Sequence, residues 1–109
     1  MIVRLVTATV KAERAGAFNE LMRQQLPSLR QSPGLVYAKL ARRMTEDSEE
    51  VVLYEEWRDT ASLYQWTGPE LMRPRLVPGA EELATSVTIV HYEALDIEPG
   101  GEPWIPGQG

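Results

Sequence analysis

The first strand predicted by the sequence places the strongest constraint on the fold. Residues 2–10 (IVRLVTATV) are rich in β-branched side chains and nearly apolar at both alternating sets of positions. A strand with one face in water alternates apolar and polar residues, whereas a strand covered on both faces is apolar throughout. The pattern therefore predicts a strand buried on two sides, and the rest of the molecule must supply two covering layers.

The segments up to residue 57 predict a helix and two further strands. Residues 11–31 carry apolar side chains at helical spacing, and Pro27 is expected to kink or end this helix. Residues 35–44 and 51–57 have the composition of strands, and the charged stretch between them is expected to be a solvated hairpin turn.

The second half of the chain predicts shorter helices and a last strand. Asp59 is a suitable N-cap for a short helix that ends before Gly68. Residues 69–76 are a candidate for a resumed helix limited by prolines, and a further helical turn is expected at 81–83. Residues 84–95 have the pattern of a fourth strand.

The order strand-helix-strand-strand-helix-strand predicts a ferredoxin-like α+β fold. In this fold a four-stranded antiparallel sheet carries its helices on one face. The other face of the doubly apolar first strand then needs a different cover. In a chain of 109 residues, the sheet of a second copy is the expected cover, so the sequence predicts a symmetric homodimer.

Composition excludes several function classes. The chain has no cysteine and a single histidine, His91, which excludes disulfides, thiol nucleophiles and multi-histidine metal sites. A net charge of −5 argues against a nucleic-acid surface. No apolar run approaches the roughly 20 residues that span a bilayer, and the N-terminus lacks a signal-peptide pattern, so no membrane partner and a cytoplasmic location are expected.

The C-terminal segment differs in composition from the body of the chain. Residues 1–95 are expected to form the folded domain, and residues 96–109 are a Pro/Gly-rich tail with three acids and no base. Trp104 and Ile105 are the large apolar side chains of this tail. They are the expected anchor, either on a partner subunit or in a crystal contact.

Several residues carry a resemblance to a known family. The stretch VVLYEEWRDTASL ends a strand in Tyr54, Glu55 and Trp57, passes Asp59 and enters a helix at Leu63, and SPGLVYAKL precedes it. Together with the element order, this resembles the antibiotic biosynthesis monooxygenase family over residues 1–95. The resemblance implies a dimer whose sheets face each other to form an α/β barrel, with a pocket between sheet and helices in each subunit.

The resemblance also implies a choice among activities. Some family members oxidise hydroquinones or polyketide-derived phenols with molecular oxygen and no metal or flavin. Others degrade heme, isomerise small sugars or have no known activity. The heme-degrading members are similar in having a Trp where this chain has Trp66, but their axial His corresponds to Leu76. Their strand-one Asn is also absent, since that strand carries Thr7 and Thr9 instead.

The phenol-oxidising members are matched in part. They resemble this chain at Trp57, but their polar residues four before and six after it correspond to Leu53 and Leu63. Many members carry a His at the position of Trp66. By analogy with the family, Trp57, Trp66, Leu53 and Leu63 are candidate walls of the substrate pocket, and the alternative for the two Trp residues is structural packing.

Candidate catalytic residues come from the titratable groups. Glu55 and Glu56 point to opposite faces, so one of them shares an apolar face with Trp57. That carboxylate is either an ion-pair partner of Arg4 on the neighbouring strand or a general base for a phenolic O–H. His91 is the second candidate base, since its ordinary pKa lies near neutrality, and its alternative is a structural role.

Three further side chains are candidates for substrate contacts. Tyr37 and Tyr92 could supply a pocket hydroxyl, although strand tyrosines more often belong to the core. Arg75, near the pocket mouth expected from the family, is a candidate partner for an anionic substituent, as is Arg73 beside it. The alternative for both arginines is a solvated face.

The favoured function is a cofactor-independent monooxygenase that oxidises a small planar aromatic, such as a hydroquinone or polyphenol, with molecular oxygen. No cofactor is expected. The alternative is a non-catalytic small-ligand-binding or stress-associated dimer of the same fold. A heme-degrading monooxygenase is the third candidate.

Overall fold

The computed structural model describes residues 1–95 of the chain. Trp104 and Ile105 lie outside the described residues, so their role as an anchor stays a prediction, as does the domain boundary after residue 95. The elements, in chain order, are β1 (Ile2–Lys11), α1 (Ala12–Arg30), β2 (Leu35–Met44), β3 (Ser48–Trp57), α2 (Thr60–Thr67), α3 (Ala80–Leu83) and β4 (Ala84–Glu93).

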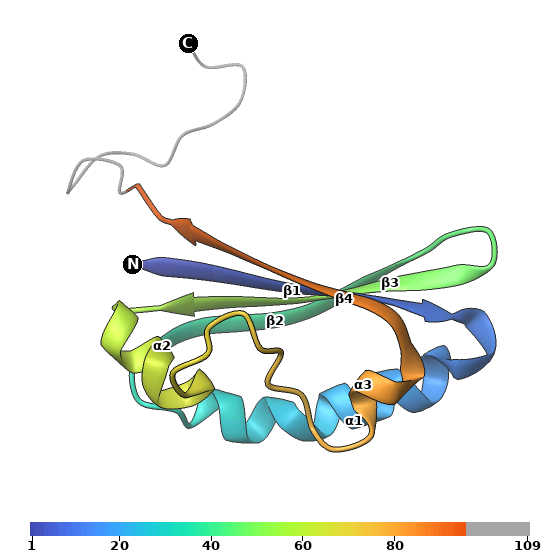
Figure 1. Cartoon of the computed structure of the whole chain (residues 1–109), viewed down its shortest axis with the longest axis horizontal. Helices are drawn as coiled ribbons and strands as arrows, with labels where there is room; N and C mark the ends of the chain where they lie inside the picture. The colour runs from blue at the N-terminus through green and yellow to red at the C-terminus, as the bar shows by residue number, and fades with distance from the viewer. Residues whose placement is uncertain (96–109) are drawn as a thin grey trace, which may run out of the picture.

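The four strands form one antiparallel sheet in the order β2-β3-β1-β4. The helices all lie on one side of this sheet, and α1 runs along its length (Figure 1). The predicted ferredoxin-like α+β fold is confirmed. Because β1 is central, its pairing with both β3 and β4 brings residues from the two ends of the chain into one site.

The two faces of the sheet differ in what covers them. Even-numbered residues of β1 from Arg4 to Val10 and odd-numbered residues of β3 point toward the helices and are buried. This helix face holds the core, in which Phe18, Leu29 and Trp57 are almost fully buried. The opposite, open face has no covering layer among the described residues. Its apolar side chains include Val3, Leu5, Val52, Tyr54, Val90 and Tyr92.

Of the two expectations about proline, one was wrong. The helix α1 passes through Pro27 and ends three residues later at Arg30, which agrees with the expected end near this proline. Residues 69–76 form no helix, because Pro69 and Pro74 leave too little chain for one and the intervening carbonyls bind a side chain of the sheet.

The charged turn is shorter than expected. Strand β3 begins at Ser48, so Glu49 and Glu50 belong to the strand rather than to the turn. Glu49 is buried on the helix face, where its Oε1 accepts hydrogen bonds from Asn19 (2.7 Å) and Arg42 (3.2 Å). The interpretation of this whole run as a solvated turn was therefore wrong for Glu49, which is a buried polar link between α1 and the sheet.

Candidate active site

Three strands assemble a row of polar side chains on the helix face, of which Arg4 and Glu55 are buried and His91 is partly buried. In the sheet register Arg4 of β1 lies between Glu55 of β3 and His91 of β4. The Arg4 and Glu55 side chains are each only 1% exposed, and Arg4 Nε lies 3.8 Å from Glu55 Oε1. The predicted partnership of Arg4 with a glutamate of β3 is confirmed. Glu55 also accepts a 2.8 Å hydrogen bond from the indole Nε1 of Trp57.

Burial shifts the pKa of each group in this row. It raises the pKa of Glu55, and the Trp57 hydrogen bond and the Arg4 charge oppose that rise. It lowers the pKa of His91, and the positive charge of Arg4 lowers this pKa further. Burial also lowers the pKa of Arg4, against the pull of Glu55. Burial therefore disfavours the charged form of all three groups, and Arg4 and Glu55 partly offset this for each other.

Arg4 also forms hydrogen bonds with the loop between α2 and α3, which stands where the sequence predicted a helix. Its Nη1 donates to the Leu71 carbonyl at 2.5 Å, and its Nη2 donates to the Arg73 carbonyl at 3.0 Å. Nη1 also lies 2.9 Å from Nε2 of His91, which accepts a hydrogen bond when the neutral ring carries its proton on Nδ1. A single guanidinium thus joins β1, β3, β4 and the loop between α2 and α3.

The two tryptophans of the central motif pack on each other. Their ring centroids are 6.3 Å apart with an interplanar angle of 31°, within the range of a direct aromatic contact. Trp57 is fully buried. The guanidinium carbon of Arg75 lies 4.2 Å from the Trp66 ring centroid, a cation–π geometry. The two rings are therefore in direct contact, and the space between them is too narrow for a third ring.

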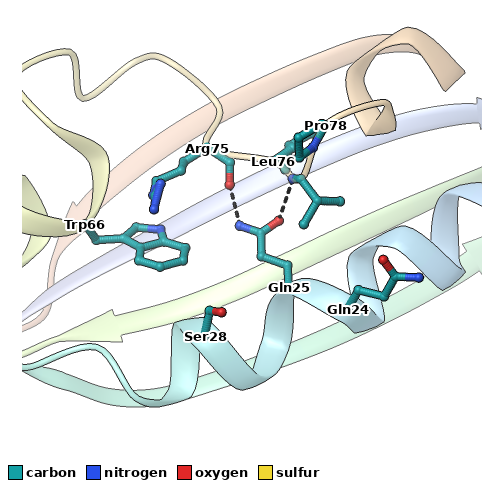
Figure 2. Close-up of a pocket in the computed structure, with 8 residues that line it drawn as sticks. Gln24, Gln25, Ser28, Trp66, Arg75, Leu76 and Pro78 are labelled. Carbon is teal, nitrogen blue, oxygen red and sulfur yellow. Dashed lines mark hydrogen bonds between the residues drawn. The ribbon is translucent and has the colours of Figure 1, made fainter.

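A cavity of about 200 Å³ opens between α1 and the loop after α2. Figure 2 shows Trp66 and Arg75 on one side of it and the amides and hydroxyl of α1 on the other. Gln25 is buried at its centre, where its Nε2 donates to the Arg75 carbonyl and its Oε1 accepts from Val77 N at 3.3 Å. The lining residues are Gln24, Gln25, Ser28, Trp66, Arg75, Leu76, Val77 and Pro78.

Only part of the predicted pocket reaches this cavity. Trp66 and Arg75 line it. Glu55 and His91 do not, because both point at Arg4 behind the loop. Leu53 and Leu63 belong to the buried core.

The two candidate tyrosines lie on the open face. Tyr37 is 47% exposed on that face, where its ring centroid is 6.0 Å from that of Tyr54. Tyr92 shares this face and is 53% exposed. Neither hydroxyl lies on the helix side of the sheet with the cavity, because strand parity turns both side chains away from it.

Gln25 was missed by the sequence analysis. It lies three residues after Met22 and four before Leu29, on the apolar stripe of α1. A polar side chain at such a position must find buried partners, so its spacing was the available signal. Its partners come from a loop that sequence patterns did not resolve.

Two further observations concern the described residues. Residues 1–95 contain no group of three or more His, Asp or Glu side chains arranged to hold a metal ion. None of the helices in the same range is long and apolar enough to cross a membrane.

Comparison with known proteins identifies the family. The sequence model of the antibiotic biosynthesis monooxygenase family matches residues 1–73, which is two thirds of the 109-residue chain. The chain belongs to this family. The predicted resemblance is therefore confirmed, and the match includes the Tyr54–Trp57 strand end and all of α2.

Solved structures share the fold at low sequence identity. Rv0793 from Mycobacterium tuberculosis is similar with a TM-score of 0.70 and 19% identity, over 90% of this chain and 98% of that one. PA3566 from Pseudomonas aeruginosa has a TM-score of 0.67 and 21% identity, over 87% and 94%. The heme-degrader MhuD from M. tuberculosis, with two hemes bound in its active site, has a TM-score of 0.60 and 16% identity, over 89% and 99%.

Identities this low support the fold alone. No curated protein sequence matches the chain significantly. The reaction of this family member therefore has to be argued from its own side chains.

Proposed function

We propose that the protein is a cofactor-independent monooxygenase that oxidises a small planar phenol, such as a hydroquinone or polyphenol, with molecular oxygen. The observation that carries the proposal is the guanidinium of Arg75 held 4.2 Å from the Trp66 ring at the edge of a cavity of about 200 Å³. An aromatic surface beside a fixed cation suits a flat ring that bears a developing negative charge.

Arg75 is the residue assigned to charge stabilisation. A cation within about 4–6 Å favours the ionised form of a phenol, so bound substrate would ionise more readily than free substrate. The carbonyl of Arg75 is fixed by Gln25 and the neighbouring Arg73 carbonyl by Arg4, which holds the guanidinium near the cavity. Pre-positioned charge of this kind needs little reorganisation during the reaction.

The chemistry then proceeds on the substrate itself. The phenolate gives one electron to oxygen, and the resulting radical and superoxide combine to form a C–O bond at a ring carbon that carries hydrogen. The proton released by the phenol returns to the peroxide oxygen. Loss of water leaves one oxygen atom on the ring as a carbonyl and releases the other in the water. The protein's part is to hold, ionise and desolvate the ring.

Glu55 and His91 have positioning roles in this proposal. Both contact Arg4, and Arg4 holds the loop that carries Arg75. Their substitution is expected to act through loop geometry rather than through proton transfer.

Oxygen uptake with a panel of hydroquinones and polyphenols tests the proposal. Arg75→Gln is expected to lower kcat/KM about tenfold or more, which is about 1.4 kcal/mol of transition-state stabilisation. Arg73→Gln is the matched control, because Arg73 is 76% exposed and pairs with Glu70 instead of lining the cavity. Equal losses in the two variants, or no uptake across the panel, would contradict the proposal.

A homodimer is part of the proposal. The open face of the sheet carries a row of apolar side chains without cover among the described residues, including Val90 (43% exposed) and Tyr92 (53% exposed). Such a face is suited to a second copy of the same sheet. Each subunit keeps its own cavity, because the cavity lies on the helix side.

A non-catalytic ligand-binding dimer is the alternative. The observation that favours it is the absence of any Asp, Glu or His among the residues that line the cavity. In that case the same hydroquinones would raise the thermal midpoint without oxygen uptake. Loss of this shift in Trp66→Ala would locate the ligand in the cavity.

Heme does not fit the residues present. The position of the family's axial histidine is Leu76, and the single histidine, His91, faces Arg4 on β4. No reaction step is therefore assigned to heme. A Soret shift on heme titration that disappears in Trp66→Ala would reverse this conclusion.

A further inference from the structure

The strand β2 forms one edge of the sheet and pairs with β3 alone. An edge strand leaves every second N–H and C=O group of its backbone without a strand partner. A cavity of about 440 Å³ lies between this edge and α1, and six consecutive residues of β2, from Tyr37 to Arg42, line it. Because consecutive side chains point to opposite faces of a sheet, such a lining follows the outer backbone edge of the strand.

The sheet register decides which side chains of β2 face α1 in this cavity. Ala38, Leu40 and Arg42 pair with residues of β3 that are buried on the helix face, so they point toward α1. Lys39 pairs with Tyr54 and points to the open face. The wall that β2 gives to the helix side is therefore apolar in its middle and cationic at one end.

The other wall of the cavity is a single stripe of α1. Its residues, at spacings of four, three and four, are Asn19, Arg23, Leu26 and Arg30. Asn19 donates to Glu49, which also accepts from Arg42, so Asn19 and Arg42 mark the same end of the cavity. Arg30 lies at the opposite end, where α1 turns back into β2.

The middle of the cavity is apolar on both walls. Leu26 of α1 and Leu40 of β2 pack against the core and remain partly exposed. An apolar side chain that enters between α1 and the edge of β2 therefore has a surface to cover on each side.

The arginines on the helix side differ in how far they are already neutralised. Arg42 lies 3.2 Å from the buried Glu49, and Arg23 lies 3.9 Å from Glu20 in an exposed pair. Arg30 forms no ion pair with any residue in the range 1–95. No Asp or Glu lines the cavity. An incoming acid can pair with Arg30 directly, and Arg23 has only a weak surface pair to give up.

The dimensions of the cavity fit a short extended chain. The stretch of β2 that lines it extends about 16 Å at about 3.3 Å per residue, which is the length of five strand residues. Side chains four residues apart on a strand point to the same face and lie about 13 Å apart. Arg23 and Arg30 lie about 10 Å apart along the helix axis, so two such side chains can reach them both.

We propose that an extended acidic segment of another protein adds to the outer edge of β2 as a fifth strand. Its backbone pairs with β2, and alternate side chains face α1. The first of these is an acid at Arg23, the second is an apolar residue between Leu26 and Leu40, and the third is an acid at Arg30. The recognised pattern is thus acid-x-apolar-x-acid, in an arrangement that combines strand addition with side-chain pockets.

Two other occupants suit the edge less well. A second copy of β2 would bring Lys39, Arg42 and Arg43 against their own equivalents, and like charges on paired strands oppose each other. The acidic residues 96–109 of the chain contain three prolines, which leave no run longer than three residues between them. Proline has no N–H to donate to a neighbouring strand, so this sequence is poorly suited to pair along β2.

Fluorescence anisotropy with the labelled peptide SETLTES tests the side-chain pattern, and SQTLTQS is the neutral probe of matched shape. The acidic peptide is expected to bind about tenfold more tightly than the neutral one, from two ion pairs of modest strength. Increasing salt should weaken the acidic peptide more than the neutral one. Equal affinities would overturn the role assigned to the arginines.

Alternate N-methylation of SETLTES tests the strand pairing. One peptide is methylated at Glu, Leu and Glu, and the other at the residues that follow each of them, so that the methyl groups lie on opposite edges of the extended chain. One of the two is expected to lose at least about tenfold in affinity and the other to stay within about threefold. Peptides that both bind as the parent does would overturn the strand addition.

The double variant Arg23→Gln/Arg30→Gln locates the peptide on the protein. It is expected to weaken SETLTES about tenfold and to leave SQTLTQS within about twofold. Both arginines are exposed, so the fold should tolerate the change, and urea unfolding checks that it does. Arg14→Gln/Arg58→Gln is the control of equal net charge, because both of its arginines are exposed and neither lines the cavity. Equal losses in the two double variants would overturn the assignment to this groove.

Two further results would assign the edge to a different occupant. If SETLTES lowers the sedimentation coefficient of the wild-type protein to that of a monomer, the edge belongs to a second copy of the chain. If a peptide of residues 96–109 binds more tightly than SETLTES, the edge belongs to the chain's own C-terminal segment. The binding surface does not depend on the proposed oxygenation, and none of these measurements uses oxygen uptake, so the two proposals fail independently.

Discussion

Arg4 is the residue on which the geometry of the candidate site depends. Its guanidinium is paired with Glu55, shared with His91 and bonded to two loop carbonyls. Replacing such a residue is expected to destabilise the fold, because removing one member of a buried ion pair leaves the charge of the other member without compensation. The loop that carries Arg75 is then held by Gln25 and by this one side chain.

Arg4→Met is expected to destabilise the fold by about 3–5 kcal/mol at neutral pH, since it leaves the Glu55 carboxylate buried and unpaired. The pKa of Glu55 is already raised by burial, so the folded state holds its proton more tightly than the unfolded state does. Stability from this group is thus greatest at low pH and falls as pH rises through the window from about 4.5 up to the folded pKa. The Arg4→Met defect should shrink on acidification.

Urea unfolding between pH 4 and 8 measures this effect. The double variant Arg4→Met/Glu55→Gln should recover much of the lost free energy, and the part of the defect that depends on pH through Glu55 should disappear, because no unpaired carboxylate remains at this position. Arg58→Met, on an exposed arginine, is the matched control. A defect of the same size at every pH would mean that lost packing and loop contacts, not the Glu55 charge, dominate.

At the same scale, sequence patterns predicted pairings within the sheet better than contacts with loops. Strand parity grouped Glu55 with Trp57 on one face, and the neighbouring first strand suggested Arg4 as the partner of Glu55 or Glu56; the structure shows that the partner is Glu55. The same reasoning could not find the bonds of Gln25, because its partners lie in an irregular loop 50 residues away in sequence. Trp66 and Arg75 were identified, but their direct contact and the packing of Trp66 on Trp57 depend on where that loop folds back.

At the scale of elements, the turn before β2 and the start of α2 meet at one glycine. Gly34 has φ of 85° and its carbonyl accepts from Arg58 N at 2.8 Å. A Cβ at this position would lie 2.1 Å from Oγ of Ser62, whose backbone N–H donates to the Asp59 cap. The predicted cap is confirmed, and the close approach explains how α2 is oriented over the sheet end.

Gly34→Ala is expected to cost about 2–4 kcal/mol, from the strained backbone together with overpacking against Ser62. Gly79→Ala is the control, because Gly79 has a similar φ of 93° but its added Cβ would meet only Leu21, at an ordinary contact distance of 3.8 Å. That control should cost only about 1–2 kcal/mol. Urea unfolding of both variants measures the difference, and equal losses would show that the contact with Ser62 relaxes freely.

The element boundaries show which sequence signals failed. All four strands and α1 were predicted within a few residues, because each has a long periodic pattern. The early start of β3 was missed because Glu49 looks like a turn residue until Asn19 and Arg42 are brought to it. Charge alone therefore could not distinguish a solvated carboxylate from a buried one.

At the scale of the whole molecule, the two faces of the sheet differ in the side chains and the cavity that they carry. The helix face holds the core and the candidate active site, while the open face carries apolar side chains that remain partly exposed. The apolar first strand needs a cover on both faces, and the described residues supply a cover on one face only. A second copy is the simplest cover for the other side, since a symmetric pair would bury equivalent patches together.

Wild-type protein is therefore expected to sediment as a dimer at micromolar concentration, and Val90→Glu should raise its dissociation constant at least about tenfold. Val90 is 43% exposed on the open face, so the charge would enter the interface without entering the core. Met72→Glu is the control, since Met72 is 65% exposed in the loop on the helix side. Urea unfolding of both variants at one protein concentration shows whether each subunit still folds. A monomeric wild type, or dimerisation unaffected by Val90→Glu, would require another cover for the open face, and the residues beyond 95 would be the next segment to test.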